Sequence, residues 1–147
     1  MNQKIVLASD HAGFKLKEEV KRYLILKGYE VVDLGPDTDQ TPVSYAKQGM
    51  KIGKEISKSK SKKMGIAFCG TGLGMSFAVN RVKGVRGARI TSIADAKMAK
   101  KHNNANILVM GGRITTTKKA VDMFNAFVRE DFESGRHNQR IADLDKF

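Results

Sequence analysis

Short apolar runs alternate with amphipathic segments along the whole chain, and this alternation constrains the fold more than any other feature of the sequence. Five runs have the length and apolar character of buried strands, and a segment with helical spacing follows each one. Strands that alternate with helices form parallel sheets with helices on both faces. The sequence therefore predicts an α/β fold with a five-stranded parallel sheet, within one domain spanning residues 1–147.

The expected elements can be placed by residue number. The segment 35–42 reads as a loop because it holds both prolines of the chain. Residues 136–147 read as a separate polar helix or arm. The expected strands cover residues 4–8, 30–34, a run ending near 69, 88–91 and 106–110, and the expected helices cover about 14–26, 43–57, 72–80, 94–101 and 117–131.

The only cysteine, Cys69, lies where an apolar run breaks into the glycine-rich turn Gly70-Thr71-Gly72 and the chain resumes as a helix. A strand end that leads into a helix start concentrates free backbone N–H groups and the positive end of a helix dipole, which bind anions and favour a thiolate. A buried structural cysteine in a strand is an equally good interpretation of the motif alone.

Composition limits the location and the partners of the chain. One cysteine cannot form an intramolecular disulfide, and no long apolar stretch is present, so we expect a cytoplasmic protein with no membrane partner. The net charge of +12 favours anionic ligands and raises the possibility of nucleic-acid binding. Much of this charge lies in residues 51–63, which contain no aromatic side chain to stack on bases. A solvated helix end and loop, with no nucleic-acid partner, is the favoured interpretation.

Polar side chains gather near the ends of the expected strands, where parallel sheets bind their ligands. Asp10 and His11 follow the first strand, Arg113 follows the last, and His102 with Asn103 precedes the last. We expect these groups to meet in one cleft with the cysteine turn. Two simpler roles remain open: Asp10 as a cap of the first helix, and His102-Asn103 as a helix C-terminal pair.

Five sequence blocks together resemble the family of B-type ribose-5-phosphate isomerases and the two subunits of galactose-6-phosphate isomerase. The resemblance runs nearly end to end and implies a Rossmann-like αβα sandwich with a C-terminal helical arm. It also implies a homodimer, or a dimer of dimers, with active sites shared between subunits. The reaction that it implies is an aldose–ketose isomerisation of a sugar phosphate without metal or other cofactor. The blocks cover residues 9–17, 69–76, 102–106, 111–113 and 135–140.

On this resemblance, Cys69 corresponds to the general base that moves a proton between C1 and C2 of the open-chain sugar through an enediolate. The N–H groups of the glycine-rich turn and Asn103 would stabilise the negative oxygen. Asp10 and His102 correspond to residues that bind hydroxyls and open the sugar ring. The resemblance assigns catalysis to Cys69, His102, Thr71 and Asp10, and substrate or phosphate binding to His11, Gly70, Gly72, Gly74, Asn103, Arg113, Arg136 and Arg140.

One departure from the family concerns the sugar pocket. Many B-type ribose-5-phosphate isomerases carry Asp-Tyr-Pro where this chain has Thr41-Pro42-Val43, and Tyr45 can replace the missing phenol in part. Ribose 5-phosphate is the expected substrate; the alternatives are galactose 6-phosphate, allose 6-phosphate or a tetrose phosphate. A noncatalytic protein that binds a sugar phosphate or a nucleic acid is the third interpretation. The whole Cys-Gly-Thr-Gly motif favours a self-sufficient homodimer.

Overall fold

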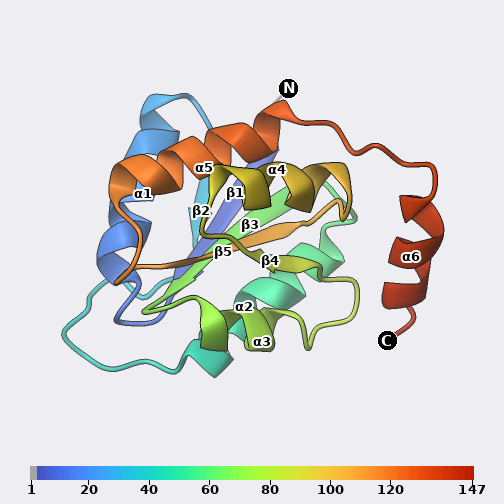
Figure 1. Ribbon diagram of the computed structural model, residues 1–147. Coiled ribbons are helices and arrows are strands. Elements are labelled where there is room, and N and C mark those ends of the chain that lie inside the picture. The colour runs from blue at the N-terminus through green and yellow to red at the C-terminus, as the bar shows by residue number, and fades with distance from the viewer. Residues whose placement is uncertain (1–2) are drawn as a thin grey trace.

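The alternation of strands and helices folds as one parallel sheet covered on both faces (Figure 1), as the sequence predicts. The computed structural model describes residues 3–147. The strands are β1 (Lys4–Ser9), β2 (Val31–Asp33), β3 (Lys63–Cys69), β4 (Gly87–Arg89) and β5 (Ile107–Gly111), in the spatial order β2-β1-β3-β5-β4. The helices are α1 (Phe14–Leu26), α2 (Tyr45–Lys58), α3 (Leu73–Val79), α4 (Ile93–Lys101), α5 (Thr117–Arg129) and α6 (His137–Leu144).

Two separate hydrophobic cores lie on the two faces of the sheet. Helices α1, α4 and α5 cover one face, and α2 and α3 cover the other (Figure 1). Successive strand residues point to opposite faces, so Phe68 of β3 enters the first core and Cys69 enters the second. Because both faces are covered, the strands are almost continuously apolar and lack the alternation of a half-exposed sheet.

Side-chain caps set several helix boundaries that the periodicity located only approximately. The Ser44 hydroxyl accepts hydrogen bonds from the N–H groups of Ala46 and Lys47, so α2 begins at Tyr45, two residues later than expected. Ser92 and Thr116 cap α4 and α5 in the same way. Among the described residues, none of the helices combines the length and the apolar composition that a bilayer-crossing segment needs.

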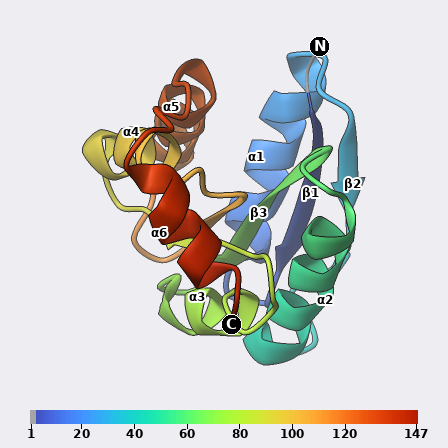
Figure 2. The same ribbon diagram turned by 90° about the vertical axis from the view of Figure 1, so that its right-hand side faces the viewer.

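The C-terminal arm is also confirmed. After α5 the chain leaves the sandwich, and α6 lies beside it (Figures 1 and 2). A guanidinium nitrogen of Arg86, just before β4, lies 3.0 Å from the Asp145 carboxylate at the end of α6. This ion pair connects the arm to the edge of the sheet.

Candidate active site

The cysteine turn holds the thiol against a backbone donor. Cys69 is the last residue of β3, and the N–H of Gly72 donates a hydrogen bond to its Sγ atom at 3.1 Å. Gly72 has φ +82°, a left-handed conformation that glycine adopts without the strain that a Cβ atom would add. Cys69 is only 4 % exposed, so it is a buried strand cysteine. It also lines a pocket. The burial fits the interpretation as a structural cysteine, and the pocket with its backbone donor fits the interpretation as a reactive thiol.

A pocket of about 380 Å³ opens at the carboxyl ends of β1, β3 and β5. It brings together a thiol, a carboxylate, an imidazole, a hydroxyl-bearing side chain and a guanidinium. Seven predicted site residues, including Gly74 of α3, therefore meet at the ends of the parallel strands, as expected. The pocket is lined by Asp10, His11, Ala12, Tyr45, Cys69, Gly70, Thr71, Gly74, Phe77 and Arg113.

Asp10 has a capping role in this pocket. Its Oδ1 atom accepts a hydrogen bond from the N–H of Gly13 at 2.9 Å, immediately before α1. The bond caps the turn that leads into α1, whereas the N-cap of the helix itself is Gly13 without a side-chain cap, so the expected role of Asp10 as the cap of the first helix is met only for this preceding turn. The same bond holds the buried carboxylate at the pocket wall.

His11 is oriented by the loop that follows β2. Its Nδ1 atom accepts a hydrogen bond from the N–H of Val43 at 3.2 Å. In the neutral imidazole the proton then resides on Nε2, which is left as a donor. This arrangement suits an anionic ligand such as a phosphate group.

Two arginines flank the turn that carries Thr71. Arg113 lies across Gly70, since a Cβ atom on this glycine would fall 2.7 Å from its Nη1 atom. Arg89 donates a hydrogen bond from Nε to the carbonyl oxygen of Thr71 at 2.9 Å. The sequence interpretation missed Arg89, although it lies at the carboxyl end of β4, where the rule used for the other strands would have found it.

Tyr45 contributes a phenol to the pocket. It lines the same pocket as Cys69, and its ring packs on Gly74, where a Cβ atom would fall 2.6 Å from Cε1. The bare glycine therefore makes room for the aromatic ring. Phe77, which the sequence interpretation did not include, also lines this pocket.

His102 and Asn103 do not lie in this pocket, so the expectation of one cleft within one chain is wrong for them. Helix α4 starts after β4 and returns the chain to the amino ends of the strands, where β5 begins. The seven residues of β3 span about 20 Å between the two edges, at about 3.3 Å per residue. His102 is the C-cap of α4, which confirms its alternative interpretation. The left-handed residue at this helix end is Asn104, with φ +43°.

At that edge, His102 lies against the C-terminal arm. Its ring stacks on His137 of α6, with the ring centroids 4.6 Å apart. The Oε1 atom of Glu133 lies within 4 Å of the Nε2 atom of each imidazole, and the exposed Arg136 immediately precedes α6. Burial, together with the positive charge of Arg136, lowers the pKa of His137 below its ordinary value. Three predicted residues, His102, Arg136 and Arg140, are thus placed together but away from Cys69.

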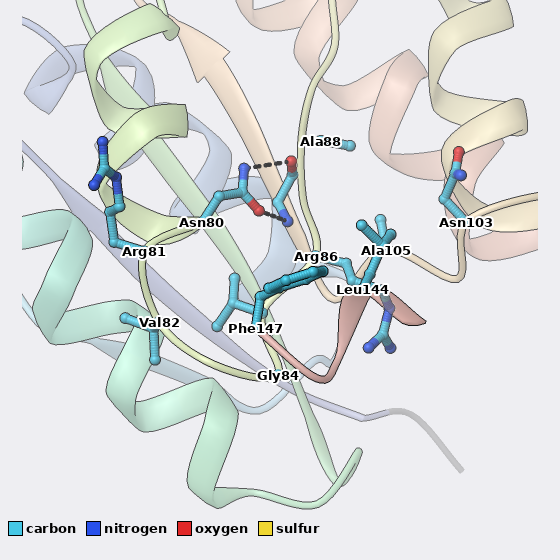
Figure 3. Close-up of a pocket in the computed structure, with 12 residues that line it drawn as sticks. Asn80, Arg81, Val82, Gly84, Arg86, Ala88, Asn103, Ala105, Leu144 and Phe147 are labelled. Atoms are coloured by element: carbon cyan, nitrogen blue, oxygen red, sulfur yellow. Dashed lines mark hydrogen bonds between the residues drawn. The ribbon is translucent and has the colours of Figure 1, made fainter. Parts of the chain in front are cut away.

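A larger groove of about 660 Å³ lies between the edge strand β4 and the arm (Figure 3). Asn103 lines it with Leu144 and Phe147. Figure 3 shows two hydrogen bonds between Asn80 and the backbone of Gly87: the side-chain amide donates to the carbonyl oxygen and its Oδ1 atom accepts from the N–H. Its described lining holds no thiol, imidazole or carboxylate. The chemistry therefore favours the smaller pocket as the reaction centre.

Comparison with known proteins identifies the family of the chain. Residues 5–144 match the family described as Ribose/Galactose Isomerase. The solved ribose 5-phosphate isomerase of Thermotoga maritima is 42% identical, with a TM-score of 0.94 and coverage of 100% of both chains.

Two further relatives show the same similarity. The ribose-5-phosphate isomerase B of Mycoplasma genitalium, solved with bound ribulose-5-phosphate, is 36% identical with a TM-score of 0.94, covering 99% of this chain and 96% of that one. The ribose-5-phosphate isomerase B of Escherichia coli is 31% identical over 97% of this chain and 94% of its own length. The chain therefore belongs to the ribose/galactose isomerase family of sugar-phosphate isomerases.

Proposed function

We propose that this protein interconverts ribose 5-phosphate and ribulose 5-phosphate through an enediolate, with Cys69 as the general base. The observation that carries the proposal is the position of the Cys69 thiol in a polar pocket, with the Gly72 N–H directed at its sulfur. The bound ribulose-5-phosphate of the Mycoplasma genitalium relative supports the choice of sugar.

The chemistry follows from the groups in the pocket. The Cys69 thiolate takes the proton from C2 of the open-chain aldose, and the C–H electron pair forms a C1–C2 double bond as the carbonyl oxygen becomes negative. Backbone donors of the turn around Thr71 stabilise that oxygen. The thiol returns the proton to C1, and the hydroxyl proton of C2 moves to the oxygen of C1. His11 and Arg113 are suited to hold the phosphate, and this grip orients the reacting carbons.

A second copy of the chain completes the site in this proposal. His102, Asn103, Arg136 and Arg140 lie at the opposite edge of the sheet from Cys69, so no single chain holds the whole predicted set in one place. Exposed apolar side chains beside the Cys69 pocket are suited to an interface: Leu73, Phe77 and Ile114 are 47%, 67% and 50% exposed. In a two-fold dimer the carboxyl edge of each chain would meet the amino edge of its partner, which gives two equivalent shared sites.

The test is turnover of a panel of aldose phosphates by the wild-type chain and by Cys69→Ser. We expect ketose formation from ribose 5-phosphate, and a loss of about a hundredfold or more in kcat with near-normal binding of a sugar-phosphate analogue by the variant. An alkoxide is much harder to form than a thiolate near neutral pH.

Thiol modification provides the matched control. Cys69 is the only cysteine, so iodoacetamide labels a single side chain, and Cys69→Ser reports any reaction elsewhere. Labelling should inactivate the enzyme, and ribose 5-phosphate should slow it. Near-wild-type turnover by Cys69→Ser, or labelling that a sugar phosphate does not slow, would contradict the proposed base.

A second candidate substrate class rests on the loop before α2. This loop presents Thr41-Pro42-Val43, and the phenol that lines the pocket belongs to Tyr45, the first residue of α2. A wall with different hydroxyl-binding groups would suit galactose 6-phosphate, allose 6-phosphate or a tetrose phosphate by the same proton transfer. The panel decides between them, because the preferred sugar is the one with the highest kcat/KM.

A further inference from the structure

Three potential metal ligands meet where the C-terminal arm passes the end of α4. Figure 1 shows α6 and the C-terminal end of α4 on the same side of the sandwich. His102, Glu133 and His137 each direct one ligand atom into the cluster, and these atoms lie within 4.8 Å of one another. The chain has three histidines, and two of them are here.

The distances are close to those around a bound ion. The Oε1 atom of Glu133 lies 3.6 Å from Nε2 of His102 and 3.8 Å from Nε2 of His137. These separations are too long for hydrogen bonds. They are slightly longer than the ligand spacing of about 3.3 Å that follows from tetrahedral zinc with bonds of about 2.0 Å. Half-exposed His102 and Glu133 have room to close around an ion.

The buried atom of His137 is an independent indication of a ligand. His137 is 6% exposed, and its Nε2 atom makes no hydrogen bond within residues 3–147. A buried nitrogen without a partner is destabilising, so a ligand that satisfies it is favoured. The same atom faces Glu133, so an ion held by this carboxylate would also satisfy the imidazole.

Nearby positive charges limit how tightly a cation can be held. Lys101 lies 3.4 Å from the other oxygen of Glu133, and Arg136 and Arg140 are close enough to act on the charge of His137. These groups oppose a cation, so the site suits reversible loading and not a permanently filled structural ion.

We propose that His102, Glu133 and His137 form a site for a divalent transition-metal ion such as Zn²⁺. Two imidazoles and one carboxylate are a donor set that such ions accept, with water completing the coordination. Resting on the function proposed above, a metal bound here occupies the imidazole of His102 and inhibits isomerisation reversibly, so the site is regulatory.

The test is a titration of the Cys69→Ser chain with Co²⁺, followed through the visible d–d absorption of the bound ion. The Cys69→Ser background removes the only thiol that could bind the ion elsewhere. We expect saturation at one Co²⁺ per chain and displacement by Zn²⁺. Loss of a direct ligand in Glu133→Gln or His137→Asn should weaken binding at least tenfold, since even groups behind the ligands are worth about tenfold or more.

Glu130→Gln is the matched control, because it removes the same charge three residues away and should leave the binding unchanged. The absence of saturable absorption, or equal binding by Glu133→Gln and the control, would overturn the metal site. The titration needs no turnover, so its failure is distinct from failure of the proposed function, which appears only in the sugar-phosphate panel.

Discussion

At the scale of single residues, one buried ammonium connects the segments beside the Cys69 pocket. Lys17 of α1 is fully buried, and its Nζ atom lies 2.8 Å from both carboxylate oxygens of Asp33 and 2.8 Å from the carbonyl oxygen of Pro36. Lys21 also donates to Asp33, at 2.7 Å. This network connects α1 and the end of β2 to the loop that later supplies the N–H donor for His11.

Replacing Lys17 should therefore destabilise the fold. Removal of one partner of a buried ion pair usually costs about 3–5 kcal/mol, because a buried charge remains. Lys21 still pairs with Asp33, so we expect a loss of about 2–3 kcal/mol for Lys17→Met in urea unfolding. The exposed Lys15→Met should change stability by less than about 0.5 kcal/mol. Equal effects of the two substitutions would contradict a structural role for this network.

The same network predicts how stability depends on pH. Burial alone would raise the pKa of Asp33, but the hydrogen bonds from Lys17, Lys21 and the N–H of Gly35 hold it below its ordinary value of 3.8. Between the lowered pKa of the folded state and 3.8, the unfolded chain therefore binds more protons than the folded chain. The stabilisation that Asp33 contributes is present above pH 3.8 and is lost as the pH falls below it.

Denaturant midpoints measured across acidic pH should reveal this contribution. Asp33→Asn should be less stable than wild type near neutral pH and should show a shallower loss below pH 3.8. Asp37→Asn, an exposed carboxylate of the same loop, should retain the wild-type slope. A slope that Asp33→Asn leaves unchanged would place the acid sensitivity elsewhere.

At the scale of elements, the close packing of α2 on α3 supports the cysteine turn. Gly49 of α2 faces Ala78 of α3 so closely that a Cβ atom on the glycine would overlap the alanine methyl, and it would fall 3.2 Å from Sδ of Met75. Helix α3 begins at the turn whose N–H meets Cys69. The spacing of the two helices therefore helps to determine where that donor lies.

This contact can be tested by swapping the methyl group between helices. Alanine is favoured over glycine inside a helix by about 1 kcal/mol, but overlap in a packed core costs about 1–3 kcal/mol, so Gly49→Ala should be destabilising. Adding Ala78→Gly removes the overlapping methyl. The double variant should then be more stable than the sum of the two single effects predicts, measured by urea unfolding. Simple additivity would show that the two helices adjust without strain.

At the scale of the whole molecule, the sheet separates the two groups of predicted site residues. Asp10, Cys69 and Arg113 lie at the carboxyl edge, and His102 lies with the arm at the amino edge. A shared site in a dimer is the arrangement that we propose to unite them.

Mixing inactive chains tests this arrangement. Cys69→Ser chains mixed with chains carrying Arg136→Ala and Arg140→Ala should form heterodimers in which one of two sites is intact, so activity should rise toward about half the wild-type value per heterodimer. Cys69→Ser mixed with Asp10→Asn is the control, because both residues line one pocket and no intact site can form. No recovery in the arginine mixture despite proven subunit exchange would place the arginines in the site of their own chain, and recovery in the control would show that Asp10 and Cys69 act in different sites.

Local features of the sequence predicted a large part of this structure. The apolar runs located all five strands, and the boundaries differed by only a few residues where caps such as Ser44 set the helix starts. The cysteine turn was also predictable, because a strand end, a left-handed glycine and a helix start are adjacent in the chain. Parallel strands end at a common edge, so the meeting of Asp10 with Arg113 followed from topology alone.

Other features depended on contacts between distant segments. No local pattern predicts the spatial order of the strands. The same holds for the hydrogen bond from Arg89 to Thr71 and for the stacking of His102 on His137, because each joins residues from different elements. Helix α4 carries His102 to the amino edge of the sheet, and for this reason the residue lies apart from Cys69. Backbone propensity, side-chain periodicity and capping act within a few residues, so the sequence by itself determined the elements and the cysteine turn. Which side chains meet across them depends on how the helices pack on the sheet, and only the tertiary structure decided that.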